Sequence, residues 1–223
     1  MDDHEIKIMA KLLASPDQEL VEFARAKLSS LDLSKLVRFG RLALVPTQII
    51  ISNALAHEPE ELNLLETAAE FGYLSQLPKE VLNDKGMLMS KSEYSEATIF
   101  HQAALRAHLD QLPQHLLTQE TMVENKCRGN WTPFSNALVN GYAAQVPPQL
   151  LTTENLLRAV GPANDPLIAL IDFNNKLDQF IGMELSEELK KFINADWWAR
   201  NQDTLKAKQE LIEPKNAPDI EVF

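Results

Sequence analysis

The sequence has a single cysteine, no long apolar run and too few basic residues to balance its acids. Because Cys127 is the only cysteine, the chain cannot form an intrachain disulfide, and this fits a reducing compartment. No window reaches the roughly 18 to 20 consecutive apolar residues that a membrane span needs. Residues 1–5 are acidic where a secretory signal would be basic, and no apolar segment follows them. These absences predict a cytoplasmic protein that does not enter a membrane.

The shortage of basic residues gives the chain a formal net charge of −11 and a pI near 4.9. A surface this negative repels phosphate backbones, so nucleic acid is not a predicted partner. The basic clusters Lys190-Lys191 and Lys206/Lys208 stand among acids on a predicted helix and are interpreted as a solvated helix face. Because charges at the rim of an interface steer association, this balance favours a protein partner with a basic surface, and binding that weakens with salt.

No catalytic or cofactor-binding motif occurs in the sequence, since a Walker loop, GxGxxG, HExxH and GxSxG are all absent. Arg128 would favour a thiolate at Cys127, but no acid–base partner is implied, so Cys127 is interpreted as an incidental loop cysteine. His101, His108 and His115 are seven residues apart and would share a face only on one continuous helix. The repeat described next interrupts such a helix. We therefore predict no metal, no cofactor and no enzymatic activity.

The sequence does contain an internal repeat. Similar strings occupy residues 63–78 (NLLETAAEFGYLSQLP), 98–113 (TIFHQAALRAHLDQLP) and 132–147 (TPFSNALVNGYAAQVP). Their final prolines are 35 and 34 residues apart, and a fixed period of this size is the signature of a repeat architecture. The chain is therefore predicted to form a row of similar structural units.

Divergent copies flank these three strings. Residues 39–46 parallel residues 71–78 at an interval of 32. A partial unit opens at residue 165 and places Gln179 34 residues after Gln145. Terminal units of a repeat normally diverge because one of their faces meets water instead of a neighbour.

Start and stop signals outline a short first helix in each unit. Thr132 followed by proline combines a capping side chain with proline at the first helical position. Gly72 and Gly141 stand where the first helix must end, in a conformation with positive φ that glycine adopts at low cost. The proline that closes each string is expected to divide the second helix into two short pieces. Thr118 and Thr152 are predicted to cap one more turn.

The string TIFHQAALRAHL resembles the ankyrin-repeat signature TPLHxAAxxGHL, and TPFSNALVNGYA resembles it again. His101 matches the histidine of TPLH and His108 that of GHL, while Ala107 replaces the glycine. The resemblance implies an all-α, ankyrin-like solenoid of about four repeats with N- and C-terminal helical caps. The tetratricopeptide repeat has a similar period but needs two longer uninterrupted helices, which the proline in the second helix opposes.

The repeat register divides the chain into predicted segments. These are N-terminal capping helices (1–29), the ankyrin-like repeats (30–181), a C-terminal capping helix (182–213) and a flexible tail (214–223). The approximate repeat boundaries are 30–61, 62–96, 97–130, 131–164 and a partial unit, 165–181. The polar segments predicted as loops are 83–95, 124–130 and 160–165.

Family resemblance implies a protein–protein interaction module that presents a concave surface to a protein partner. The contact positions that it implies lie just after the TPLH-type histidine and just before the glycine. They are Thr67, Glu70, Gln102, Leu105, Arg106, Asn136, Val139 and Asn140. Leu105 and Val139 are apolar, so they are interpreted either as the core of an interface or as packing between neighbouring first helices.

The adjacent rings of Trp197 and Trp198 have two interpretations. Both rings can cover the open end of the solenoid, or Trp198 can face outward and contact a protein. We include Trp198 among the predicted partner-binding residues.

One functional alternative to a general binding module remains open. The chain could be an immunity-type or inhibitory partner, or a structural partner, of a protein encoded by a neighbouring gene. In either case the expected state is a monomer or a weak homodimer.

Overall fold

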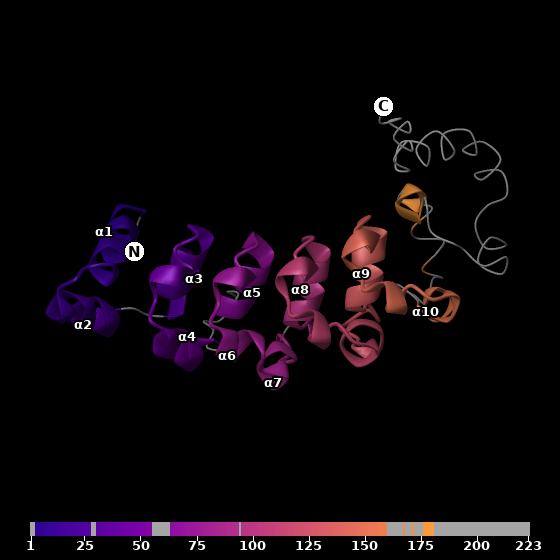
Figure 1. Cartoon of the computed structure of the whole chain (residues 1–223), viewed down its shortest axis with the longest axis horizontal. Helices are drawn as coiled ribbons and strands as arrows, with labels where there is room; N and C mark the ends of the chain where they lie inside the picture. The colour runs from indigo at the N-terminus through magenta and orange to yellow at the C-terminus, as the bar shows by residue number, and fades with distance from the viewer. Residues whose placement is uncertain are drawn as a thin grey trace, which may run out of the picture.

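The computed structural model describes residues 3–27, 30–54, 63–93, 95–159, 167, 171 and 176–180. All regular elements in these ranges are helices or helical turns, without a strand, so the all-α prediction is confirmed. In Figure 1 the helices follow one another along one direction, in the order of the chain. The predicted C-terminal capping helix, the tail, the loop at 160–165 and Trp198 lie outside the described residues.

The elements fall into an N-terminal helix pair and a series of similar units. The pair consists of α1 (Asp3–Leu13) and α2 (Gln18–Lys27). The first unit contains α3 (Ser30–Arg38), η1 (Leu42–Leu44) and α4 (Thr47–Asn53). The second contains α5 (Leu64–Phe71), η2 (Leu74–Gln76), α6 (Lys79–Leu82) and α7 (Lys85–Leu88). The third contains α8 (Ile99–Leu105), η3 (Leu109–Gln111), η4 (Gln114–Leu116) and η5 (Gln119–Glu124). The fourth contains α9 (Pro133–Val139), η6 (Ala143–Gln145), η7 (Pro148–Leu150) and α10 (Thr153–Arg158), and is followed by η9 (Leu177–Phe180).

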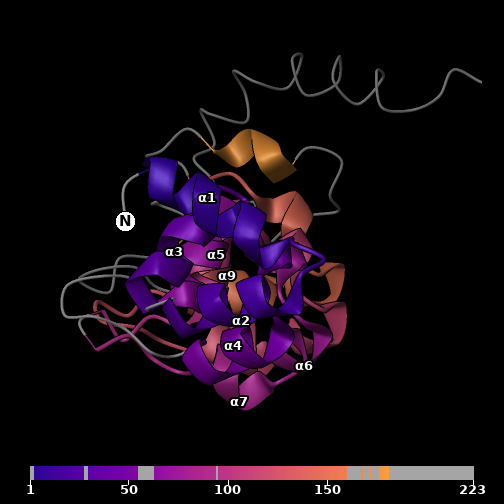
Figure 2. The same cartoon turned by 90° about the vertical axis from the view of Figure 1, so that its left-hand side faces the viewer.

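The helices that open the units, α3, α5, α8 and α9, lie side by side. Contacts join α3 to α5, α5 to α8, and α8 to α9. Viewed from the N-terminal end in Figure 2, α3, α5 and α9 lie one behind another. We call these four helices the first helices.

Reciprocal hydrogen bonds fix the start of three first helices. In the second unit the Asn63 backbone N–H donates to the Glu66 carboxylate (2.9 Å), and the Glu66 N–H donates to Asn63 Oδ1 (2.8 Å). In the fourth unit the Thr132 N–H donates to Ser135 Oγ (2.8 Å), and the Ser135 N–H donates to Thr132 Oγ1 (3.1 Å). These capping boxes satisfy backbone donors that a helix start leaves without an intrahelical partner. His101 takes the corresponding place in the third unit.

The turn that ends each first helix uses one residue with positive φ. Its φ is 65° at Gly40, 75° at Gly72, 63° at Ala107 and 86° at Gly141, so the prediction for Gly72 and Gly141 is confirmed. Ala107 adopts the same turn although left-handed backbone is unfavourable for a residue with a Cβ. At Gly72 an added Cβ would lie only 2.7 Å from Cε1 of His108. The glycine there leaves room for the imidazole ring of the next unit.

Proline divides the second half of each unit, as predicted. Pro113, with φ −59° and ψ 125°, separates η3 from η4, and Pro147 separates η6 from η7 in the same way. The predicted caps are also confirmed, because the Thr118 side chain accepts from the Thr121 N–H and Thr152 from the Asn155 N–H. The loop prediction for 83–95 was partly wrong. The Asp84 side chain accepts from the Met87 N–H and begins α7 there, so a cap stands where composition indicated only a turn.

Apolar side chains at repeated positions form one continuous core along the row. Leu65, Phe100 and Phe134 of the first helices are fully buried. The other buried sets that recur from the second to the fourth unit are Leu74/Leu109/Ala143, Leu77/Leu112/Val146, Val81/Leu116/Leu150 and Leu88/Met122/Leu156. Each unit therefore buries its apolar side against the next one.

A series of glutamines connects neighbouring units. Gln111 accepts a hydrogen bond at Oε1 from the Ser75 N–H (3.3 Å), and Gln145 accepts one at Oε1 from the Leu109 N–H (3.1 Å). Gln76 and Gln179 make the equivalent bonds to Ala43 N–H (3.4 Å) and Ala143 N–H (3.0 Å). Gln145 also donates from Nε2 to the Ala107 carbonyl (2.7 Å), which holds the turn with positive φ. The predicted register between Gln145 and Gln179 is confirmed by these bonds.

None of the helices in the described ranges is both long and apolar enough to cross a bilayer.

Truncation of Leu112 tests this core. Leu112 is 3% exposed, so Leu112→Ala should lower the free energy of unfolding by about 2 to 5 kcal/mol in urea denaturation. Leu105→Ala, at a side chain that is 40% exposed, should lower it by about 1 kcal/mol or less. Equal, small effects of both substitutions would mean that residue 112 is not part of the core.

Candidate functional site

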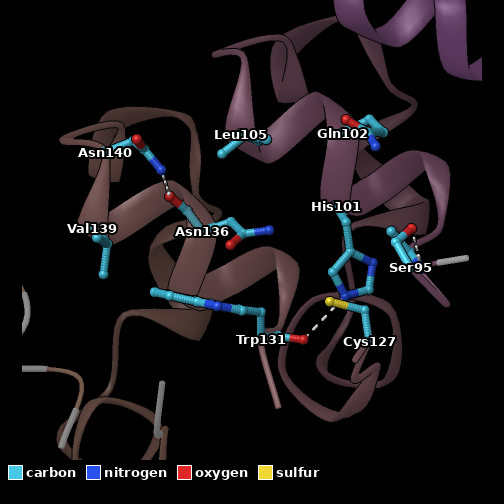
Figure 3. A pocket seen from close by; sticks show the side chains of 10 residues that line it. Ser95, His101, Gln102, Leu105, Cys127, Trp131, Asn136, Val139 and Asn140 are labelled. Carbon is cyan, nitrogen blue, oxygen red and sulfur yellow. Dashed lines mark hydrogen bonds between the residues drawn. The ribbon is translucent and has the colours of Figure 1, made fainter. Parts of the chain in front are cut away.

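A hollow of about 420 Å³ lies between α8, α9 and the loop at residues 125–131 that joins the third unit to the fourth. Figure 3 shows its lining from close by. The lining residues are Ser95, Ala97, His101, Gln102, Leu105, Cys127, Trp131, Asn136, Val139 and Asn140. We call this space the α8–α9 hollow.

Backbone hydrogen bonds close the loop that forms one wall of the hollow. The Cys127 N–H donates to the Trp131 carbonyl (2.9 Å), and the Asn130 N–H donates to the Cys127 carbonyl (3.1 Å). Gly129 (φ 84°) and Asn130 (φ 66°) supply the tight reversal between them, and both residue types tolerate left-handed backbone. The loop thereby directs the Trp131 carbonyl toward His101, and in Figure 3 the indole ring lies below Asn136 and Val139.

A second contact joins this loop to the preceding one. The Arg128 N–H donates to the Ser95 carbonyl (2.9 Å), and the Lys91 ammonium donates to the Lys126 carbonyl (3.1 Å). The wall of the hollow is therefore built by two successive loops that are hydrogen-bonded to each other.

His101 ties the hollow to the start of α8. Its Nδ1 accepts from the Thr98 backbone N–H (3.1 Å), so Nδ1 carries no proton and the neutral ring is protonated at Nε2. Nε2 then donates to the Trp131 carbonyl at 3.2 Å. Burial lowers the pKa of His101 to about 4, and Lys91 acts in the same direction. At neutral pH this histidine is an uncharged link between two units, with both nitrogens engaged.

Cys127, the other group of potential chemistry in the hollow, is half-buried. Burial raises the pKa of its thiol, and Lys91 does not offset that effect. A thiolate favoured by Arg128 is therefore not supported at this position. With His101 neutral and Cys127 protonated, the lining of the hollow carries no charge at neutral pH.

The structure brings five of the predicted contact residues together at the hollow, namely Gln102, Leu105, Asn136, Val139 and Asn140. The two members of the apolar pair differ in their surroundings, and the packing interpretation holds for Val139. Leu105 is 40% exposed, whereas Val139 is half-buried and packs against the core. Asn140 donates from Nδ2 to the Asn136 backbone carbonyl (2.8 Å). The Asn136 side chain points into the hollow in Figure 3.

The other predicted contact residues lie elsewhere. Thr67 is fully buried, and its hydroxyl donates to the Asn63 carbonyl (2.9 Å), so its assignment to the binding surface was wrong. Glu70 and Arg106 form an ion pair of 2.9 Å between α5 and α8, beside the hollow. Trp198 lies outside the described residues.

Trp131 is the main lining residue that the sequence reasoning missed. It stands immediately before the capping residue Thr132, as Ala97 stands before Thr98, and both line the hollow. The repeat register could therefore have indicated this position. The contribution of Cys127 and Ser95 could not be found in this way, because it depends on the path of two loops.

The three regularly spaced histidines have different surroundings. His101 is buried in the start of α8, His108 contacts Gly72, and His115 is exposed. Over the ranges that the structure describes, no group of three or more His, Cys, Asp or Glu residues could hold a metal ion.

The link made by His101 predicts a pH dependence of stability. Because the folded state lowers its pKa from 6.5 to about 4, the unfolded chain binds more protons between these values. The contribution of His101 to the free energy of unfolding is complete above pH 6.5 and is lost as pH falls toward 4, by about 3 kcal/mol in all. Urea denaturation of wild type and His101→Gln should therefore give a stability difference that shrinks over this range.

The control for this prediction is His115→Gln, which replaces an exposed histidine. The stability difference between wild type and His115→Gln should stay constant over the same pH range. A difference between wild type and His101→Gln that does not change from pH 7.5 to 4.5 would contradict the burial of a neutral imidazole.

The sequence matches no protein-family model, and the curated proteins contain no significant match to it. A function therefore has to be inferred from the geometry of the site.

Proposed function

We propose that this chain is a protein-binding module, built as an ankyrin-type solenoid, whose docking surface is centred on the α8–α9 hollow. Three features support the ankyrin-type assignment. Capping boxes recur at Asn63, Thr98 and Thr132, turns with positive φ follow each first helix, and inter-unit glutamine bonds recur with the same period. The short, proline-divided second halves of the units do not support the tetratricopeptide alternative.

The observation that carries the proposal is the lining of the hollow. In a chain with 24% charged residues, ten residues from two helices and two loops meet without one charged side chain. Trp131 and Leu105 supply apolar surface, and tryptophan is enriched among the residues that dominate binding energies. The amides of Gln102 and Asn136 add donors and acceptors suited to the main chain of a peptide. An uncharged side chain of a partner fits this combination.

Hydrogen bonds favour a pre-formed docking surface over a flexible one. Gln145 holds the turn after α8 through the Ala107 carbonyl, and His101 joins α8 to Trp131. A surface that is rigid before binding loses less conformational entropy when a partner docks.

An enzymatic role is not part of the proposal. Both ring nitrogens of His101 are hydrogen-bonded to the backbone, and burial raises the pKa of Cys127. Neither group is poised as a general base or a nucleophile. An inhibitory partner of a neighbouring-gene protein would be a special case of the proposed module.

A charge at the mouth of the hollow tests the proposal. Leu105→Arg should reduce recovery of a specific partner at least tenfold, because the partner would have to bury an unpaired charge. The measurement is quantitative affinity capture from the cells that produce the protein, with mass spectrometry of the bound fraction. The melting temperature should change little, since Leu105 is 40% exposed.

Leu20→Arg is the matched control. Leu20 is 42% exposed but belongs to α2, outside the proposed docking surface, so recovery should stay at the wild-type value. Equal recovery with Leu105→Arg and Leu20→Arg would contradict the assignment of the docking surface.

A further inference from the structure

The first helices present a surface whose charge differs from that of the whole chain. The repeat register identifies three positions on each first helix, the fifth, the second and the first residue before the positive-φ residue of the turn that ends it. With the buried Thr67 left out, they are Lys35, Arg38, Phe39, Glu70, Phe71, Gln102, Leu105, Arg106, Asn136, Val139 and Asn140. We call this set the first-helix face.

The first-helix face is basic although the chain is acidic. It holds three basic residues and one acidic residue, which gives +2 on the face against −11 for the whole chain. The single acid, Glu70, is already paired with Arg106 at 2.9 Å. Among the ion pairs between side chains that the structure describes, none involves Lys35 or Arg38. The available positive charge is therefore concentrated on α3.

Two exposed aromatic rings accompany that charge. Phe39 is 45% exposed and Phe71 is 43% exposed, at equivalent places just before the turn glycines. The Arg38 guanidinium lies 5.9 Å from the centre of the Phe71 ring, a cation–π arrangement that joins α3 to α5. Large apolar side chains exposed on the same face are typical of interaction sites. The α3–α5 end of the face combines two cations with two rings. At the α8–α9 end the face carries one cation, Arg106, which is paired with Glu70, and the lining of the hollow is uncharged.

The two ends are within reach of one extended peptide. Figure 1 shows α3, α5, α8 and α9 as successive members of the row, so three steps separate the ends. Packed helices are about 8 to 10 Å apart, which gives roughly 24 to 30 Å in total. An extended chain rises about 3.3 Å per residue, so roughly 7 to 9 residues would cover this distance.

We propose that the occupant of the first-helix face is an acidic, extended segment of a partner protein. Its carboxylates pair with Lys35 and Arg38, next to apolar contacts with Phe39 and Phe71. An uncharged apolar side chain of the same segment, roughly 7 to 9 residues away, enters the α8–α9 hollow. This inference rests on the proposed function. The net charge of the whole chain predicts a basic partner, whereas this face favours an acidic one.

The probe for this inference is a displayed library of random 16-residue peptides, selected on the wild-type protein. Selected peptides should carry Asp or Glu near one end and an aromatic or aliphatic residue roughly 7 to 9 positions away. A synthetic copy of the strongest peptide is then measured by fluorescence anisotropy. Lys35→Glu combined with Arg38→Glu should weaken its binding at least tenfold, and Lys35→Gln with Arg38→Gln should weaken it less.

The matched control is Lys11→Glu combined with Lys79→Glu. These exposed lysines lie on α1 and α6 and do not belong to the first-helix face, and their reversal changes the net charge by the same amount. Binding should remain at the wild-type value, which separates a local ion pair from a general effect of charge. The melting temperature of each variant shows whether it is folded. If the charge-reversed variant loses the fold, the glutamine variant is used for the binding measurement instead.

Each outcome bears on one of the two proposals. If Leu105→Arg abolishes peptide binding and the charge reversal has no effect, the acidic segment is wrong and the proposed function stands. If only the charge reversal acts, the acidic segment stands and the hollow is not the docking site. Selection of peptides without acidic residues, or of none, overturns the inference, while the capture experiment decides the proposed function separately. Displacement of the peptide by a single-stranded oligonucleotide would assign the face to phosphates, and selected peptides that match this chain would assign it to a second copy.

Discussion

The contact between neighbouring units is the constraint on which the rest of the structure depends. First helices such as α8, with seven residues, are shorter than the roughly 12 to 15 residues at which even an isolated good helix becomes marginal. Their apolar sides are buried only because another unit lies against them. Within that contact, Gln111, Gln145 and Gln179 each bond the backbone of the preceding unit, so the amides fix the register while the leucines supply the burial. Stability in such a row is shared between neighbours, not held by any one unit.

The candidate site is a product of the same contact. No single unit forms the α8–α9 hollow, because its walls come from two first helices and from two loops that bond each other through Arg128 and Ser95. The neutral His101 spans the boundary by joining the start of α8 to the Trp131 carbonyl. A rigid boundary of this kind places Leu105 and Asn136 at fixed positions, which is what a docking surface requires.

Local features of the fold could be predicted from sequence, and features that join units could not. Gly72 and Gly141 indicated turns with positive φ, and the prolines indicated a divided second helix, because both residue types restrict the backbone by themselves. Asp84 and Thr67 were misjudged. The cap at Asp84 stood among turn residues, and Thr67 occupies a nominal contact position but points into the core. The charge of the first-helix face was also hidden, since total composition does not say that Arg38 lies beside Phe71.

Photo-crosslinking tests the proposed docking surface most directly. A photoreactive amino acid is placed at Gln102, which lines the hollow, or at Gln114, an exposed glutamine in the second half of the same unit. After capture and irradiation, docking on the first helices predicts a covalent adduct with the partner from position 102 and none from position 114. An adduct from position 114 alone, or equal adducts from both, would contradict this account.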